Sequence, residues 1–190
     1  MRTHLRTLVW SSLDDDMGHE YFSLYETHDG FEYDSVIAMR FDGKPLRIEY
    51  RILLNRDWHT QAVDVKAWQG SHEAKVHLRV DDEKRWWRDA EELVACRGCI
   101  DVDVSLTPAT NTLPLRRLRL KDGERGEIVT AWIRFPSLEV RPFPQRYTRM
   151  TADEYLFESL EDDFKATLKL DDLQLVTDYV GSWRAIASLP

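Results

Sequence analysis

The sequence predicts a mainly β protein: a twisted antiparallel sheet curled into a partial β-barrel, with at most one or two short helices. Apolar and polar residues alternate with a period of two along many segments, which is typical of strands that bury one face. Turn signals rich in Asp, Asn and Gly separate those segments, and Asp-Gly pairs supply the positive φ angles that tight hairpins need. Consecutive hairpins leave exposed sheet edges, and curling toward closure protects those edges.

Strands are expected wherever this alternation is clearest. Leu46, Ile48 and Tyr50 face one side of a predicted strand over 46–54, and the charged residues between them face the other. The same pattern predicts strands over 74–80, 100–106, 127–135, 164–170 and 173–180, with turns at 29–30, 42–43, 55–57, 81–82 and 122–123. Apolar residues in 82–94 and 151–164 also fit helical spacing, so each of these segments is a short helix or an irregular strand.

The segment TPATNTLPLRRLRL, residues 107–120, interrupts the alternation. Leu113 and Leu115 have one parity and the next two leucines have the other, so a strand that buried all four would need a β-bulge near Arg116–Arg117. Two prolines remove ladder N–H donors and favour an edge or a bend. We therefore expect a polar turn or crossing followed by a bulged strand.

Composition limits the function classes. The 190 residues, 43% hydrophobic and 32% charged, predict one globular domain over 1–190. Seven Trp, seven Tyr and seven Phe could fill a core or line a cavity. A formal net charge of −8 argues against general nucleic-acid binding. Residues 113–149 nevertheless hold nine basic and four acidic side chains, a segment that could hold an anionic small ligand or form a solvated strand face.

No signal peptide or membrane span is predicted, because the apolar run at the N-terminus is short and three aspartates follow it. These features predict a cytoplasmic protein. Cys96 and Cys99 form the only cysteine pair, and zinc would need two further ligands that the scattered histidines do not supply. We therefore expect free structural thiols, no metal and no cofactor.

The stretch GCIDVDVSLTPATNTLPLRRLRL, residues 98–120, resembles the signature of a bacterial family described as glycolipid-binding proteins, roughly G-C-x-D-V-D-x-x-x-T-P-x-T-N-T-L-P-x-R-R-L. Residues 50–65, 145–150 and 164–185 also resemble that family, whereas Ala109 stands where a larger apolar residue is usual. The resemblance implies a partial barrel similar to periplasmic lipoprotein carriers. It also implies an amphipathic ligand, such as a glycolipid, on the concave face of the sheet.

Asp101 and Asp103 share one face of the predicted strand, and three roles are open for them: pairing with arginines across the sheet, binding a ligand, or catalysis. No nucleophile, metal or phosphate-binding motif accompanies them. The residues expected to contact a ligand lie in the segments that resemble the family. They are Arg51, Trp58, Asp101, Asp103, Thr110, Asn111, Arg116, Arg117, Tyr147, Asp178, Tyr179 and Trp183.

These observations favour a non-enzymatic protein that binds an amphipathic lipid or glycolipid. One alternative is an enzyme that acts on a sugar- or lipid-like substrate through Asp101 or Asp103, with Asp178 as a further candidate. Another is an interaction module that uses a sheet edge, which a large exposed apolar patch would favour. The oligomeric state does not follow from the sequence.

Overall fold

The computed structural model describes residues 2–13 and 17–190. The three aspartates at 14–16, which argued against a signal peptide, lie outside the described residues. Within these residues, fifteen strands form one sheet in the order β8-β7-β6-β5-β4-β3-β2-β1-β15-β14-β13-β12-β11-β10-β9. The neighbouring pairs are antiparallel, apart from the parallel pair β9 and β10. The first and last strands of the chain therefore pair in the middle of the sheet.

The first eight strands form a meander. They are β1 (Thr3–Ser12), β2 (Gly18–Glu26), β3 (Gly30–Phe41), β4 (Lys44–Asn55), β5 (Thr60–Gln69), β6 (His72–Val80), β7 (Trp86–Arg88) and β8 (Glu91–Glu92). The 3-10 turn η1 (Val94–Cys96) and the short strand β9 (Val102–Val104) follow, and then η2 (Ala109–Asn111) and the helix α1 (Thr112–Leu118). The chain ends with β10 (Arg125–Arg134), β11 (Glu139–Arg149), β12 (Glu154–Ser159), β13 (Lys165–Leu170), β14 (Val176–Tyr179) and β15 (Trp183–Leu189).

The mainly β prediction is confirmed. Leu46, Ile48 and Tyr50 of β4 are buried on one face, as their alternation requires. The β3–β4 hairpin turns through Asp42 and Gly43, whose φ angles of 50° and 72° are those of a two-residue hairpin loop. The two segments that fitted both helical and strand spacing, 82–94 and 151–164, contain the short strands β7, β8 and β12, joined by turns and bends.

The bulged strand predicted near Arg116–Arg117 is wrong, because this segment is the helix α1. The shift in leucine parity arises from helical periodicity, which places Leu115 and Leu118 three residues apart on one face. Pro114 lies in the first turn, where its missing N–H breaks no intrahelical bond. Two other predicted strands are shorter in the structure. Only β9 forms within the predicted strand 100–106, and only β14 forms within the predicted strand 173–180.

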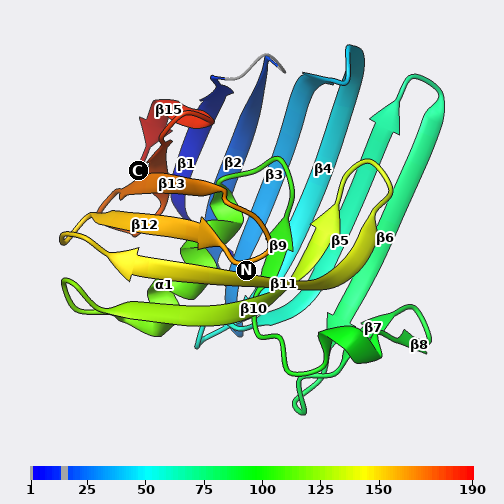
Figure 1. Cartoon of the computed structure of the whole chain (residues 1–190). Coiled ribbons are helices and arrows are strands. Elements are labelled where there is room, and N and C mark those ends of the chain that lie inside the picture. Colours follow the sequence, from blue (N-terminus) through cyan, green and yellow to red (C-terminus); the bar gives the residue numbers. More distant parts are fainter. Residues whose placement is uncertain (1, 14–16) are drawn as a thin grey trace.

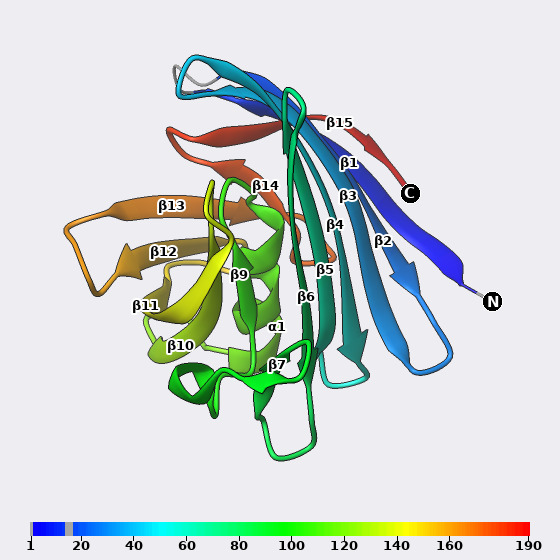
Figure 2. The same ribbon diagram turned by 90° about the vertical axis from the view of Figure 1, so that its right-hand side faces the viewer.

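The sheet is curled but open. Strands β1 to β6 form a long wall, and β10 to β13 cross in front of it with α1 between the two layers (Figures 1 and 2). Near the β9 edge, the backbone of the preceding loop is tied to the start of β5: Thr60 N–H donates to Ile100 O at 3.2 Å, and Val102 N–H donates to Thr60 Oγ1 at 3.1 Å. These bonds connect the β9 edge of the sheet to β5, although β9 and β5 are not paired as neighbouring strands.

The concave face of the wall is covered by protein. The larger core packs the inner face of β1 to β6, including the fully buried Trp10 and Tyr33, against β9, η2 and the start of α1. A smaller core packs Leu115 of α1 against aromatic residues of β11 and β12. The ligand expected on the concave face would therefore compete with α1 and its buried leucines.

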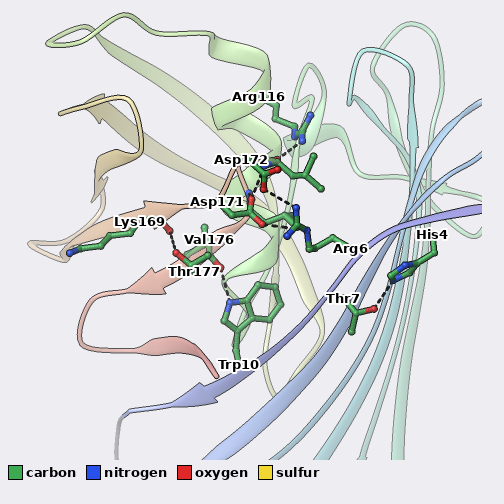
Figure 3. A network of polar contacts seen from close by, with 12 residues as sticks. His4, Arg6, Thr7, Trp10, Arg116, Lys169, Asp171, Asp172, Val176 and Thr177 are labelled. Atoms are coloured by element: carbon green, nitrogen blue, oxygen red, sulfur yellow. Dashed lines mark hydrogen bonds and ion pairs between the residues drawn. The ribbon is translucent and has the colours of Figure 1, made fainter. Parts of the chain in front are cut away.

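Side chains of β1 hold the turn that precedes β14, more than 160 residues away in the sequence (Figure 3). Arg6 donates to Asp172 at 2.8 Å, and the indole Nε1–H of Trp10 donates to Val176 O at 2.7 Å. Arg116 of α1 reaches the same turn and donates to the carbonyl oxygen of Leu173. These contacts fix the wall, the helix and the C-terminal hairpin relative to one another. The candidate site is a cavity beside the same hairpin.

Candidate functional site

A cavity of about 390 Å³ lies between β9, β10, β11, β12 and the β14–β15 hairpin. We call it the aromatic cavity. Its lining consists of Trp132, Phe143, Phe157, Phe164, Tyr179, Trp183, Asp103, Ser105, Thr107, Asn111, Ser159, Asp162, Ser182, Val104 and Leu106. A second hollow, of about 540 Å³, lies beside β5 and β6, but its lining has a single aromatic side chain, Trp87. Aromatic residues and converging polar groups make the aromatic cavity the better ligand site.

Strand pairing gathers the aromatic rings. Tyr179 and Trp183 face each other across the β14–β15 hairpin, whose turn passes through Gly181 at a φ of 89°. Trp132 of β10 stacks on Phe143 of β11, with ring centroids 4.5 Å apart. These rings give the cavity an apolar surface large enough to stack on a sugar ring or to hold part of an acyl chain.

Phe164 extends this aromatic surface to the opening of the cavity. Its side chain is 46% exposed, although its ring lies 6.1 Å from that of Phe157 and 6.3 Å from that of Tyr179. An exposed Phe at the edge of an aromatic cluster leaves apolar surface in contact with water. A bound apolar group would cover that surface, and the hydrophobic effect would favour binding.

Asp103 is a half-buried carboxyl group that lines the cavity. It pairs in register with Trp132 of the neighbouring strand, and its Oδ2 accepts a hydrogen bond from the amide of Gln145. Burial raises the pKa of Asp103 to about 6, although the Gln145 hydrogen bond works in the opposite direction. Among the described residues, its Oδ1 has no hydrogen-bond partner, so this oxygen can accept a bond from a ligand.

The amide of Gln145 is oriented by a buried polar chain. The Tyr147 hydroxyl lies 3.0 Å from Gln145 Oε1 and 2.9 Å from Asn111 Oδ1, and its single hydrogen serves one of the two. Asn111 Nδ2 donates in turn to Pro108 O at 3.3 Å. The oxygen of Gln145 lies on the Tyr147 side of the amide, and its NH2 group donates to Asp103.

A second carboxyl group, which is fully buried, lies behind the cavity wall. Glu20 of β2 is fully buried, and its Oε1 accepts hydrogen bonds from Ser35 at 2.7 Å, Tyr50 at 2.5 Å and Thr107 at 2.9 Å. Burial raises the pKa of Glu20 to about 7. Thr107 lines the cavity, and it follows Leu106, which has a left-handed φ of 67°. Glu20 therefore anchors a strained segment of the cavity wall.

Asp101 lies outside the cavity lining, although it is two residues from Asp103. It is fully buried and accepts a hydrogen bond from Arg117 Nη2 at 2.6 Å. Arg116 points elsewhere, with its guanidinium 3.9 Å from the centroid of the Trp58 ring. Trp58 itself stacks on Phe31. This cluster joins α1 to the wall.

The structure separates the twelve residues predicted to contact a ligand. Four line the aromatic cavity: Asp103, Asn111, Tyr179 and Trp183. Two support it from behind: Tyr147, described above, and Thr110, whose hydroxyl accepts the Val104 N–H at 3.3 Å. Six lie outside its lining: Arg51, Trp58, Asp101, Arg116, Arg117 and Asp178. Arg51 faces away from the core and pairs with Glu32, and Asp178 pairs with Arg184 at 3.5 Å.

Sequence reasoning missed several residues of the site. Glu20 occupies the same strand parity as the buried Phe22 and Leu24, so a carboxyl among core positions was a signal that the pattern contained. Gln145 and Phe164 lie in segments that resemble the family, but nothing marked these two residues as part of a cavity, because their roles depend on how β11 and the β12–β13 turn meet β9. Their positions follow from long-range pairing alone.

Cys96 and Cys99 are both buried, without a disulfide. Within residues 2–13 and 17–190, no group of three or more potential ligands is placed to hold a metal ion. No helix in this part of the chain is long and apolar enough to cross a membrane.

Comparison with known proteins identifies the family. A crystal structure of a DUF1089 family protein from Pseudomonas aeruginosa has a TM-score of 0.78 and 37% sequence identity, over 87% of this chain and 91% of that chain. Curated proteins give no significant match. The sequence pattern of one family matches residues 7–185, which include every residue that lines the aromatic cavity. The chain therefore belongs to the family described as "putative glycolipid-binding".

Proposed function

We propose that the protein binds an amphipathic lipid or glycolipid and that the aromatic cavity holds part of it. The single observation that carries this proposal is the composition of the cavity. Six aromatic side chains face a set of hydroxyl, amide and carboxylate groups. An amphipathic molecule needs such a pairing of apolar and polar walls.

The volume of the cavity limits what it can hold. About 390 Å³ is near the lower end of the range of roughly 300–1,000 Å³ that is usual for small-molecule sites. This volume suits a head group or one end of a chain rather than a complete lipid with two acyl chains. The remainder of the ligand would extend past Phe164, along a surface where Leu160 and Val180 are also exposed.

The first experiment is native mass spectrometry of the purified protein, followed by solvent extraction of any bound molecule. We expect an amphiphile in the wild-type protein and its loss in Phe164→Ser, because this change removes the aromatic edge of the cavity. Tyr21→Ser is the matched control, since Tyr21 is 56% exposed on β2 and lies outside the cavity lining. The control should retain the amphiphile.

Two results would contradict the proposal. One is an adduct that remains equally abundant in Phe164→Ser, which would place the ligand elsewhere. The other is a wild-type protein that carries no adduct and also fails to bind an added alkyl glucoside at millimolar concentration. Either result would remove the aromatic cavity as the ligand site.

A specific observation supports a second candidate, an enzyme that acts on glycosides. Asp103 and Asp162 line the same cavity in opposite environments. Burial raises the pKa of Asp103, whereas hydrogen bonds from Ser159 and the Phe164 backbone lower the pKa of Asp162. Such a pair suits an acid and a base in glycoside hydrolysis. Release of nitrophenol from aryl glycosides by the wild type, and its loss in Asp103→Asn, would support this activity.

A further inference from the structure

The charges that line the aromatic cavity are all acidic. Asp103 and Asp162 are the two ionisable residues with a formal charge at neutral pH among its lining residues, and no Lys, Arg or His accompanies them there. The neutral polar groups are an amide and five hydroxyls, those of Asn111, Ser105, Thr107, Ser159, Ser182 and Tyr179. The basic segment 113–149 therefore does not supply a cation to the lining.

The two arginines that lie over the Trp132 ring already have carboxylate partners. Arg141 lies 4.7 Å from the Trp132 ring centroid, but both of its terminal nitrogens bind Glu161 at 2.7 Å. Arg134 lies 5.0 Å from the same ring and pairs with Glu139 at 3.6 Å. A phosphate or carboxylate in the cavity would have to compete with these partners, and it would face the Asp103 carboxylate directly.

The unpaired oxygen of Asp103 favours a ligand group that donates a hydrogen bond. With Oδ2 occupied by Gln145, Oδ1 is an acceptor that a sugar hydroxyl can satisfy. Ser105 Oγ accepts the indole N–H of Trp132 at 2.7 Å, so its own hydrogen is available to a ligand oxygen. A hydroxyl-rich ring could therefore donate to Asp103 and accept from Ser105 while its apolar face contacts the aromatic wall.

We infer that the aromatic cavity selects uncharged sugar head groups over anionic ones and that Asp103 determines this specificity. The inference rests on the proposed function and narrows its ligand class. A like charge placed beside Asp103 costs binding energy without a compensating cation. A trialkylammonium group would suit the carboxylates and the rings, but it would leave the hydroxyls and the Asn111 amide without partners.

Three soluble probes with the same tail separate these possibilities: octyl glucoside, octyl glucuronide and octyltrimethylammonium, each titrated calorimetrically below its micelle concentration. At pH 7.5 we expect octyl glucoside to bind at least about 10-fold more tightly than octyl glucuronide, because like charges oppose the latter. In Asp103→Asn the preference should fall below about 3-fold, since the repelling charge is gone. Asp163→Asn is the matched control: it removes an exposed charge next to Asp162 but outside the lining, and the preference should persist.

A second readout needs no variant. Between pH 7.5 and pH 5, Asp103 gains a proton, because its pKa lies at about 6. The glucuronide carboxylate stays ionised over most of this range, so the preference for octyl glucoside should shrink as the pH falls. This result would separate the effect of the Asp103 charge from any effect of the substitution on folding.

The outcomes are distinguishable. Equal binding of glucoside and glucuronide, or tightest binding of octyltrimethylammonium, would overturn the selectivity inference and leave the proposed function standing. Failure of all three probes to bind would overturn the proposed function as well. A preference that persists unchanged in a folded Asp103→Asn protein would remove Asp103 as the specificity-determining residue.

Discussion

Asp101 is fully buried against the guanidinium of Arg117, whereas Asp103, two residues later, is held by the neutral amide of Gln145 and lines a cavity. Both carboxyl groups have a raised pKa, and burial is the largest cause in each case. The two regions differ in what opposes that burial: an ion pair in one and a single amide hydrogen bond in the other.

The difference shows how one short segment performs two tasks. An aspartate paired with arginine is satisfied within the protein and joins α1 to β9. An aspartate with an unpaired oxygen keeps acceptor capacity for a molecule that enters the cavity. Proximity in sequence therefore says little about shared function, and the partner of each carboxyl group says more.

The largest expected effect is the loss of stability when the ion pair between Asp101 and Arg117 is broken. Arg117→Ala should lower the free energy of unfolding by about 3–5 kcal/mol, because it leaves a buried carboxylate unpaired. Chemical denaturation measures this change. Arg134→Ala is the matched control, since Arg134 is 44% exposed and its loss should cost less than about 0.5 kcal/mol. A similarly small effect in Arg117→Ala would mean that the pair contributes nothing to stability.

The next largest effect is the dependence of stability on pH that the raised pKa of Asp103 causes. Its pKa is raised in the folded state from 3.8 to about 6, so the folded state binds more protons between these values. The stability that this group contributes is present below about pH 4 and is lost as the pH rises through about 6. Relative to Asp103→Asn, the wild type should therefore lose about 2 kcal/mol of unfolding free energy between pH 4 and pH 7. Parallel stability curves for the two proteins would show that Asp103 has an ordinary pKa.

A smaller effect tests the amide that distinguishes Asp103. Gln145→Ala removes a hydrogen bond that favours the charged carboxylate, so the pKa of Asp103 should rise by a further 1–2 units, roughly. Carbon NMR of the labelled carboxyl group follows this titration directly. Gln69→Ala on β5 is the control and should leave the titration of Asp103 unchanged. A lower pKa in Gln145→Ala would reverse the assigned role of the amide.

Local sequence patterns predicted the strands well and the site in part. The alternation in β4 and the Asp42–Gly43 turn are local properties, so they appear in the fold as expected. The helix α1 was missed because Leu113 and Leu115 also fit strand spacing and seven residues are too few to display a helical period clearly.

The family resemblance directed attention to the correct segment, but it could not divide that segment between its two tasks. Arg117 and Asn111 both belong to the quoted motif, yet only Asn111 lines the cavity. Phe164 lies in the β12–β13 turn and Glu20 lies in β2, and the placement of both near the segment 103–107 depends on how the sheet curls. The parity of Glu20 in β2 indicates that it is buried, but the segment that each of these residues meets cannot be read from a single sequence.

The most direct test of the central claim is NMR chemical-shift mapping during titration with octyl glucoside. If the ligand enters the aromatic cavity, the largest shifts should fall on the backbone amides of 103–107, 159–164 and 182–183 and on the indole N–H of Trp183. The indole N–H of Trp58 and the side chain of Arg117 should stay unchanged, because they lie outside the cavity lining. Shifts centred on Arg117 and Trp58 instead would place the ligand in the Asp101 region and contradict the assignment of the two regions.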